Sequence, residues 1–105
     1  MEGLNRVTPA TLDVLEVLLD QSVEHYGFMI AKSAHLPTGS VFPILARLER
    51  VGWVTSYWED IDPDSRGARR RFYRLSADGV RAARQVLAER RGHGLSGKLA
   101  WDGAL

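Results

Sequence analysis

The sequence predicts a mainly α-helical domain that carries a small β-hairpin and ends in one further helix. Three observations favour this fold class. Apolar residues recur with helical spacing through the first half of the chain, two short aromatic and β-branched runs follow, and turn-forming residues separate those runs. With 105 residues, 45% of them hydrophobic and 26% charged, the chain is long enough for one domain with its own core.

The first helix is expected at about residues 8–20. Thr8 is a suitable N-cap, and Pro9 suits the first helical position because the N–H that proline lacks has no helical partner there. Residues 1–7, which precede this cap, are expected to form a flexible leader. Leucines then recur at helical spacing, at Leu12, Leu15 and Leu19.

Two more helices are expected before residue 52. The first of them is short and stops before Pro37, because a residue that precedes proline is disfavoured in helical geometry. The next begins within residues 38–40, with Ser40 as the best N-cap candidate. Pro43 then falls in the first turn, where proline is tolerated. Gly52 suits the left-handed conformation that commonly follows a helix end.

Strands and a fourth helix complete the predicted order. Residues 53–58 and 71–75 are rich in aromatic and β-branched side chains and are expected to pair as a hairpin. Ser76 is a candidate N-cap for a helix over residues 77–91. Residues 92–105 contain four glycines and are expected to form a flexible tail.

Positive charge is concentrated in one segment. Lysine and arginine number 14 against 13 acidic residues, which gives a formal net charge of only +1. Residues 66–74 nevertheless hold several arginines and no acid. Such a segment can bind a polyanion while the whole chain stays near neutral. These arginines are Arg66, Arg69, Arg70, Arg71 and Arg74.

Three helices followed by a β-hairpin is the element order of a winged helix-turn-helix. In that architecture the third helix enters the DNA major groove, and the hairpin, called the wing, lies beside it over the backbone or minor groove. The predicted DNA-binding domain therefore covers residues 8–76. The apolar face of the third helix would leave Ser40, Arg47 and Arg50 on other faces, and the wing would carry the arginines.

Four stretches of the chain carry a resemblance to a known family. They are Tyr26-Gly27, the run T-G-S-V-F-P-I-L-A-R-L-E-R-V-G-W from Thr38 to Trp53, Tyr57-Trp58-Glu59, and R-R-R-F-Y-R-L-S from Arg69 to Ser76. Together they resemble the PadR family of bacterial transcriptional regulators, over about residues 8–80. At the start of the recognition helix the family usually has threonine where this chain has Ser40, and tyrosine where it has Phe42.

The resemblance implies a homodimeric repressor that binds double-stranded DNA at a pseudo-palindromic operator. Family dimers are held largely by C-terminal helices packed on the partner's N-terminal region, which gives residues 77–91 a dimerisation role. The residues then expected in the dimer interface are Leu12, Leu15, Leu19, Val80, Ala83 and Leu87. The residues expected to contact DNA are Lys32, Thr38, Gly39, Ser40, Phe42, Arg47, Arg66, Arg69, Arg70 and Arg71.

Two alternatives accompany this hypothesis. Some family members bind flat aromatic compounds, so Trp58, with Trp101 from the tail, is a candidate contact for a small aromatic effector; packing of the hairpin on the helices is the favoured explanation of the aromatic strand. For the whole domain, the alternative is a winged helix that binds only proteins, with its arginines facing an acidic partner.

Other function classes are disfavoured by composition. The chain has no cysteine, which excludes a disulfide scaffold, thiol catalysis and cysteine-ligated zinc. Its three histidines are scattered, and no spacing indicates a metal site, a cofactor motif or catalytic residues. No apolar run approaches the roughly 20 residues that span a bilayer, and no signal peptide begins the chain. We therefore expect a cytoplasmic protein that is not an enzyme.

Overall fold

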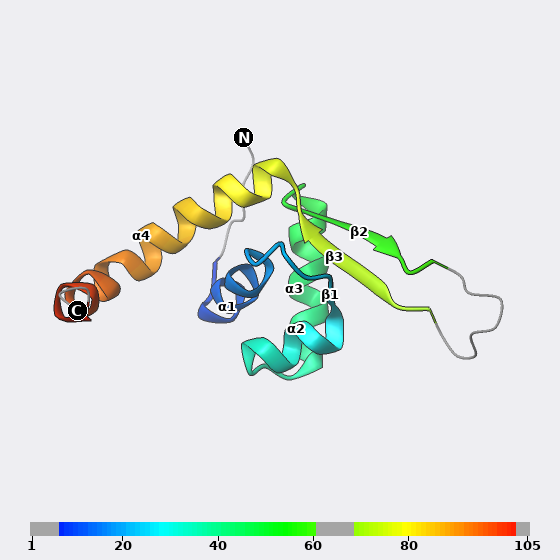
Figure 1. The fold of residues 1–105 in the computed structure, drawn as a ribbon, viewed down its shortest axis with the longest axis horizontal. Coiled ribbons are helices and arrows are strands. Elements are labelled where there is room, and N and C mark those ends of the chain that lie inside the picture. The colour runs from blue at the N-terminus through cyan, green and yellow to red at the C-terminus, as the bar shows by residue number, and fades with distance from the viewer. Residues whose placement is uncertain (1–6, 61–68, 103–105) are drawn as a thin grey trace.

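A computed structural model describes residues 7–60 and 69–102, with side chains up to Arg91. The described elements are, in order, α1 (Pro9–Leu18), β1 (His25–Tyr26), α2 (Gly27–Ala34), α3 (Thr38–Arg50), β2 (Val54–Trp58), β3 (Arg71–Leu75) and α4 (Ala77–Asp102). Figure 1 shows α1, α2 and α3 gathered at the centre, with the β2–β3 hairpin projecting on one side and α4 on the other. The order confirms the predicted winged helix-turn-helix with one helix after the wing.

The ends of the first three helices follow local chemistry. The Thr8 hydroxyl accepts a hydrogen bond of 3.1 Å from the N–H of Thr11, so the predicted cap of α1 is confirmed. The prediction that Ser40 caps α3 is wrong. Pro37 occupies the cap position, and its carbonyl accepts the Ser40 N–H at 2.9 Å, which places Ser40 inside the first turn. Gly52 has a φ of +83°, the left-handed conformation expected there.

The hairpin belongs to a three-stranded antiparallel sheet of order β1-β3-β2. Val54 pairs with Leu75 at one end of β2, and Trp58 pairs with Arg71 at the other. Strand β1 was not predicted: a two-residue strand is too short to show alternation, and Tyr26 stands directly before a helix. Its addition to β3 ties the segment before α2 to the base of the wing.

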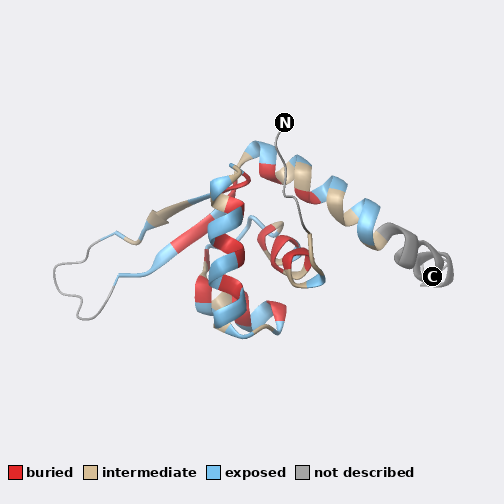
Figure 2. Cartoon of the chain, turned by 180° about the vertical axis from the view of Figure 1, so that it is seen from behind, coloured by how far each residue is buried: buried red, intermediate tan, exposed pale blue. Residues whose placement is uncertain are grey.

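The core lies where the inner faces of α1, α2 and α3 meet the sheet. Figure 2 shows buried residues along one side of α3 and around α1. Four apolar residues of α3 are at most 4% exposed, and they pack with side chains from both neighbouring helices and from the two long strands. The core residues of α3 are Val41, Ile44, Leu45 and Leu48.

Helix α4 begins as predicted and ends later. The Ser76 hydroxyl accepts the Gly79 N–H at 3.0 Å, which confirms the predicted cap. The helix then continues to Asp102, over the segment expected to be a flexible tail, so the expected end near Arg91 is corrected. Once a helix is established, each added residue gains a hydrogen bond, so glycines weaken such a segment without necessarily ending it.

The contact between α4 and the segment that joins α3 to β2 predicts a large loss of stability on adding one methyl group. A Cβ at Gly79 would overlap the carbonyl oxygen of Trp53, whereas a Cβ at Gly39 would meet nothing within 4 Å. Gly79→Ala should lower the free energy of unfolding by about 1–3 kcal/mol. Gly39→Ala should leave it unchanged or raise it by up to about 1 kcal/mol. Urea denaturation followed by circular dichroism measures both, and equal midpoints would contradict the packing described.

Candidate nucleic-acid interface

Helices α2 and α3 form the helix-turn-helix. Between them His35 adopts a left-handed conformation with φ of 58°, and the Leu36 N–H donates to the Ala31 carbonyl at 2.9 Å. This closes α2 and redirects the chain into Pro37, whose extended conformation precedes α3. Because the inner face of α3 is fixed in the core, its opposite face is presented to solvent.

The outward face of α3 combines small, apolar and cationic side chains. Of the α3 residues expected to contact DNA, Thr38 is half-buried and the others are exposed. Lys32 is exposed on the last turn of α2. Helices α2 and α3 contain one acidic residue, Glu49, against three cations. The exposed residues of this face are Gly39, Ser40, Phe42, Pro43, Ala46, Arg47 and Arg50.

The described wing arginines are stacked on aromatic rings. The guanidinium carbons of Arg69 and Arg71 lie 5.5 and 5.2 Å from the ring centroid of Trp58. That of Arg70 lies 4.7 Å from the ring centroid of Tyr26 in β1. Stacking of this kind holds a guanidinium in place while its N–H donors remain able to reach a phosphate. Arg66, also expected to contact DNA, lies outside the described residues.

Arg71 differs from its neighbours because it links the wing to α3. Its Nη2 donates to the Ser56 hydroxyl at 2.7 Å and lies 3.6 Å from Oε2 of Glu49. The Ser56 hydroxyl in turn donates to Glu49 Oε2 at 2.6 Å. The sequence alone does not distinguish Arg71 from the other wing arginines. Its contact with Glu49 could not be predicted, because the two residues are distant in the chain. Arg71 therefore positions the wing as well as carrying charge.

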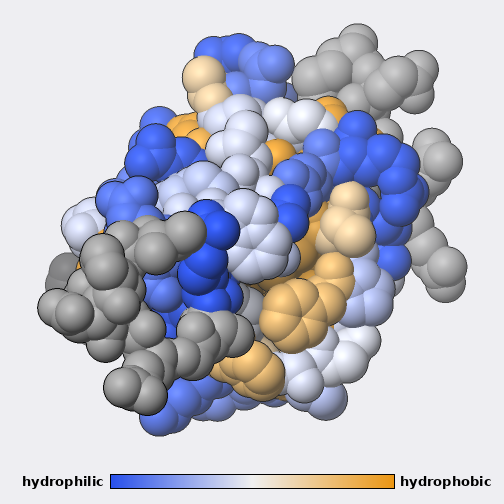
Figure 3. All heavy atoms as spheres, turned by 90° about the vertical axis from the view of Figure 1, so that its right-hand side faces the viewer, coloured by the Kyte–Doolittle hydropathy of each residue, from blue (hydrophilic) through white to orange (hydrophobic). Residues whose placement is uncertain are grey.

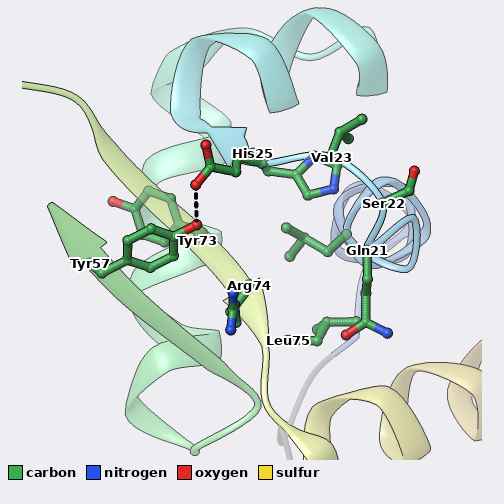
Figure 4. Close-up of a pocket in the computed structure, with 10 residues that line it drawn as sticks. Gln21, Ser22, Val23, His25, Tyr57, Tyr73, Arg74 and Leu75 are labelled. Atoms are coloured by element: carbon green, nitrogen blue, oxygen red, sulfur yellow. Dashed lines mark hydrogen bonds between the residues drawn. The ribbon is translucent and has the colours of Figure 1, made fainter. Parts of the chain in front are cut away.

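A cleft of about 420 Å³ lies between the loop after α1 and the sheet. Figure 4 shows Tyr57 and Arg74 on its sheet side and residues 21–25 opposite. The Tyr57 hydroxyl donates to the Glu24 carboxylate at 3.0 Å. Removal from solvent and this hydrogen bond raise the pKa of Tyr57, so the phenol stays a neutral donor at physiological pH.

Trp58, one of the two residues expected to bind an effector, does not line this cleft. Trp58 is 51% exposed and lines a separate hollow of about 240 Å³, together with Tyr57 and Phe72. The side chain of Trp101 lies outside the described residues. The favoured explanation of the aromatic residues, packing of the hairpin on the helices, agrees with the position of Trp53. This residue lies in the core and is 4% exposed.

The residues expected in a dimer interface divide into two groups. Leu15 and Ala83 have no exposed surface, and Leu12 is 7% exposed, so these three belong to the interior of one chain. Within one chain these three residues therefore leave little surface for contact with a second chain. The other three are half-buried at the edge of the core, where surface remains for a second chain: Leu19, Val80 and Leu87.

An ion-pair cluster holds α4 against α1 within the chain. Arg91 pairs with both Asp13 and Glu16. The hydrogen bond to Asp13 raises the pKa of Arg91 above its usual value, so this arginine stays charged. The pairing fixes the direction in which α4 leaves the domain, next to α1.

Within the described ranges, no group of histidine, cysteine or acidic side chains could hold a metal ion. In the same ranges, no helix combines the length and the apolarity needed to cross a membrane. The site thus consists of an exposed recognition helix, one flanking lysine and a cationic wing.

A winged helix-turn-helix with an exposed, cationic third helix and an arginine-bearing wing defines a DNA-binding winged-helix protein. The model of the transcriptional regulator PadR-like family matches residues 14–85, which is more than half of the chain. The chain belongs to this family, and it is a DNA-binding transcriptional regulator rather than an enzyme. A comparison with curated protein sequences finds no match.

Known structures share the fold at low sequence identity. A mutant of ZitR from Lactococcus lactis is 17% identical with a TM-score of 0.70, and the match covers 100% of this chain and 66% of that one. The PcaV transcriptional regulator from Streptomyces coelicolor, in complex with its natural ligand, is 21% identical with a TM-score of 0.71 and coverages of 91% and 63%. The smu.1704 protein of Streptococcus mutans is 19% identical with a TM-score of 0.66 and coverages of 97% and 97%.

The stacking on Trp58 predicts that this ring supports DNA binding. Trp58→Ala should weaken binding to a random-sequence duplex roughly two- to tenfold, because Arg69 and Arg71 lose the ring that orients them. Trp58→Phe keeps an aromatic face and should retain most of the affinity. Fluorescence anisotropy of a labelled duplex at low salt measures this, and an unchanged affinity of the alanine variant would refute a supporting role.

Proposed function

We propose that the protein is a repressor that binds a pseudo-palindromic operator as a homodimer in the cytoplasm. The observation that carries the proposal is the exposed outer face of α3 beside the arginine wing. Phosphate contacts from Lys32, Arg69 and Arg70 would supply most of the affinity and little sequence preference. The start and outer face of α3 would supply the sequence preference, since that face meets base edges when the helix enters the major groove.

The first turn of α3 supports close approach to DNA. No side-chain hydrogen bond caps this helix among the described residues, and Gly39 and Ser40 are small and exposed. The N–H groups of a helix start attract phosphate through hydrogen bonding and the helix dipole. Thr38, at the beginning of this turn, would contact the same strand.

Two recognition helices related by a two-fold axis would bind half-sites about one helical turn apart. In this proposal the half-buried residues at the edge of the core, Leu19, Val80 and Leu87, contact the second chain. Release from DNA would follow from a small aromatic effector that favours another spacing of the two recognition helices, with Trp58 and Trp101 as its contacts. The PcaV structure, which contains that protein's natural ligand, supports the idea that a protein of this fold can bind a ligand.

The direct test is a titration against DNA from the protein's own upstream region, repeated at several salt concentrations with a random duplex as control. Tight binding that is selective for the upstream region, with a steep salt dependence, is the expected result. Equal and weak binding to both duplexes would contradict the proposal and favour a winged helix that binds only proteins.

Removal of one wing arginine should change the salt dependence of binding. Arg70→Ala should weaken binding to every duplex alike, and the negative slope of log K against log salt concentration should become less steep by about 0.9 for each phosphate that the variant no longer neutralises. Arg81→Ala removes the same charge from α4, where Arg81 pairs with Asp78. That control should leave the slope unchanged. Equal slopes for Arg70→Ala and the wild type would contradict a phosphate contact.

The proposed dimer predicts a concentration-dependent assembly that one substitution weakens. Leu87→Asp places a charge at the half-buried edge of α4 and should shift sedimentation velocity toward the monomer. Gln85→Asp places the same charge on the exposed side of the helix and should leave the distribution unchanged. If Leu87→Asp sediments like the wild type while its circular dichroism spectrum is intact, Leu87 lies outside the interface.

A further inference from the structure

Two exposed aromatic rings meet where α2 and α3 cross. Phe28 is 67% exposed and Phe42 is 41% exposed, although exposed large apolar side chains are uncommon in this domain. Their ring centroids lie 6.0 Å apart with an interplanar angle of 81°, an edge-to-face contact. The Phe42 ring also lies over Gly27, where a Cβ would overlap it. Contacts with two residues of α2, Phe28 and Gly27, therefore hold the Phe42 ring in place on the surface.

The neighbours of Phe42 on α3 carry few hydrogen-bonding groups. Helical spacing places Gly39 and Ala46 beside it, and Thr38 is the neighbour at this spacing that has a side-chain hydroxyl. Neither α2 nor α3 contains asparagine or glutamine, the residues that commonly bind adenine edges. Figure 3 shows apolar surface on the side of the molecule from which the wing projects, bordered by hydrophilic side chains.

This surface matches one chemical feature of the major groove. The C5-methyl group of thymine is the apolar group that the groove presents, and phenylalanine and alanine are among the side chains that contact it. We infer that Phe42 recognises thymine through its C5-methyl group, and that Phe28 is a positioning residue that holds the Phe42 ring. The inference rests on the proposed function, because it requires α3 to enter the major groove.

The charges around the rings favour DNA over a protein as the occupant of this surface. Lys32 and Arg47 are exposed on the same two helices, and the acid there, Glu49, already accepts from Ser56 and lies beside Arg71. DNA has a phosphate backbone on both sides of the groove that the rings would enter, and the cations around the two rings can neutralise those phosphates.

The experiment first selects a duplex from a random library with the full-length wild-type protein. Each thymine of the selected duplex is then replaced, one at a time, by uracil, which removes the methyl group and keeps the base pair. For the wild type, at least one replacement in each half-site should weaken binding about fourfold, the effect of one buried methyl-sized group. Phe42→Ala should bind the thymine and uracil duplexes equally, and Phe42→Leu, which keeps an apolar contact, should retain part of the difference.

Controls separate this inference from the function on which it rests. Val23→Ala removes an exposed apolar side chain from the loop after α1 and should keep the full thymine preference. Thermal denaturation of each variant checks that the domain is folded. If the wild type binds the selected duplex specifically but never distinguishes uracil from thymine, the inference is overturned and the proposed function stands. If no duplex is selected, both the proposed function and this inference fail. If Phe42→Ala changes the sedimentation of the protein but keeps the thymine preference, the rings form a protein contact and the inference is overturned.

Discussion

The burial of one face of α3 is the constraint on which the rest of this structure depends. Four aliphatic side chains of that helix are almost completely removed from water, and each such burial contributes roughly 1.5–3 kcal/mol to folding. A helix repeats every 3.6 residues, so fixing one face also fixes which residues point outward. Ser40, Phe42 and Arg47 are exposed because the four core residues hold the other side of the helix inside. Stability of the domain and geometry of the exposed face of α3 are therefore determined by the same contacts.

Strand β3 carries both buried residues that anchor the wing and exposed arginines. In β3, Phe72, Tyr73 and Leu75 are buried while Arg71 and Arg74 are exposed. The buried aromatic residues anchor the strand, and its exposed arginines lie over the Trp58 and Tyr57 rings of β2. The short strand β1 has a role out of proportion to its length, because it places Tyr26 beneath Arg70. A hairpin alone would leave that guanidinium without this support.

Helical spacing and turn residues predicted the helices and the hairpin, because each of these signals is local. The features that sequence analysis missed depend on contacts between distant residues. A leucine stripe such as that of α1 looks the same in the sequence whether a partner or the chain's own core covers it, so the sequence alone could not place Leu15 in the core. Ser40 was a reasonable cap by composition, but the conformation of Pro37 moved the helix start upstream. The exposure of Phe28 could not be foreseen, since a phenylalanine in a short helix usually faces the core.

The contact of Glu49 with Ser56 and Arg71 has a consequence for how binding can be regulated. It joins α3 to the wing through side chains on three elements, so that within one chain these two parts are held together. In the proposed dimer, half-sites separated by a different distance would then be reached by rotation of one whole subunit against the other. A change of operator spacing would require substitutions where the two subunits meet and would leave α3 and the wing unchanged.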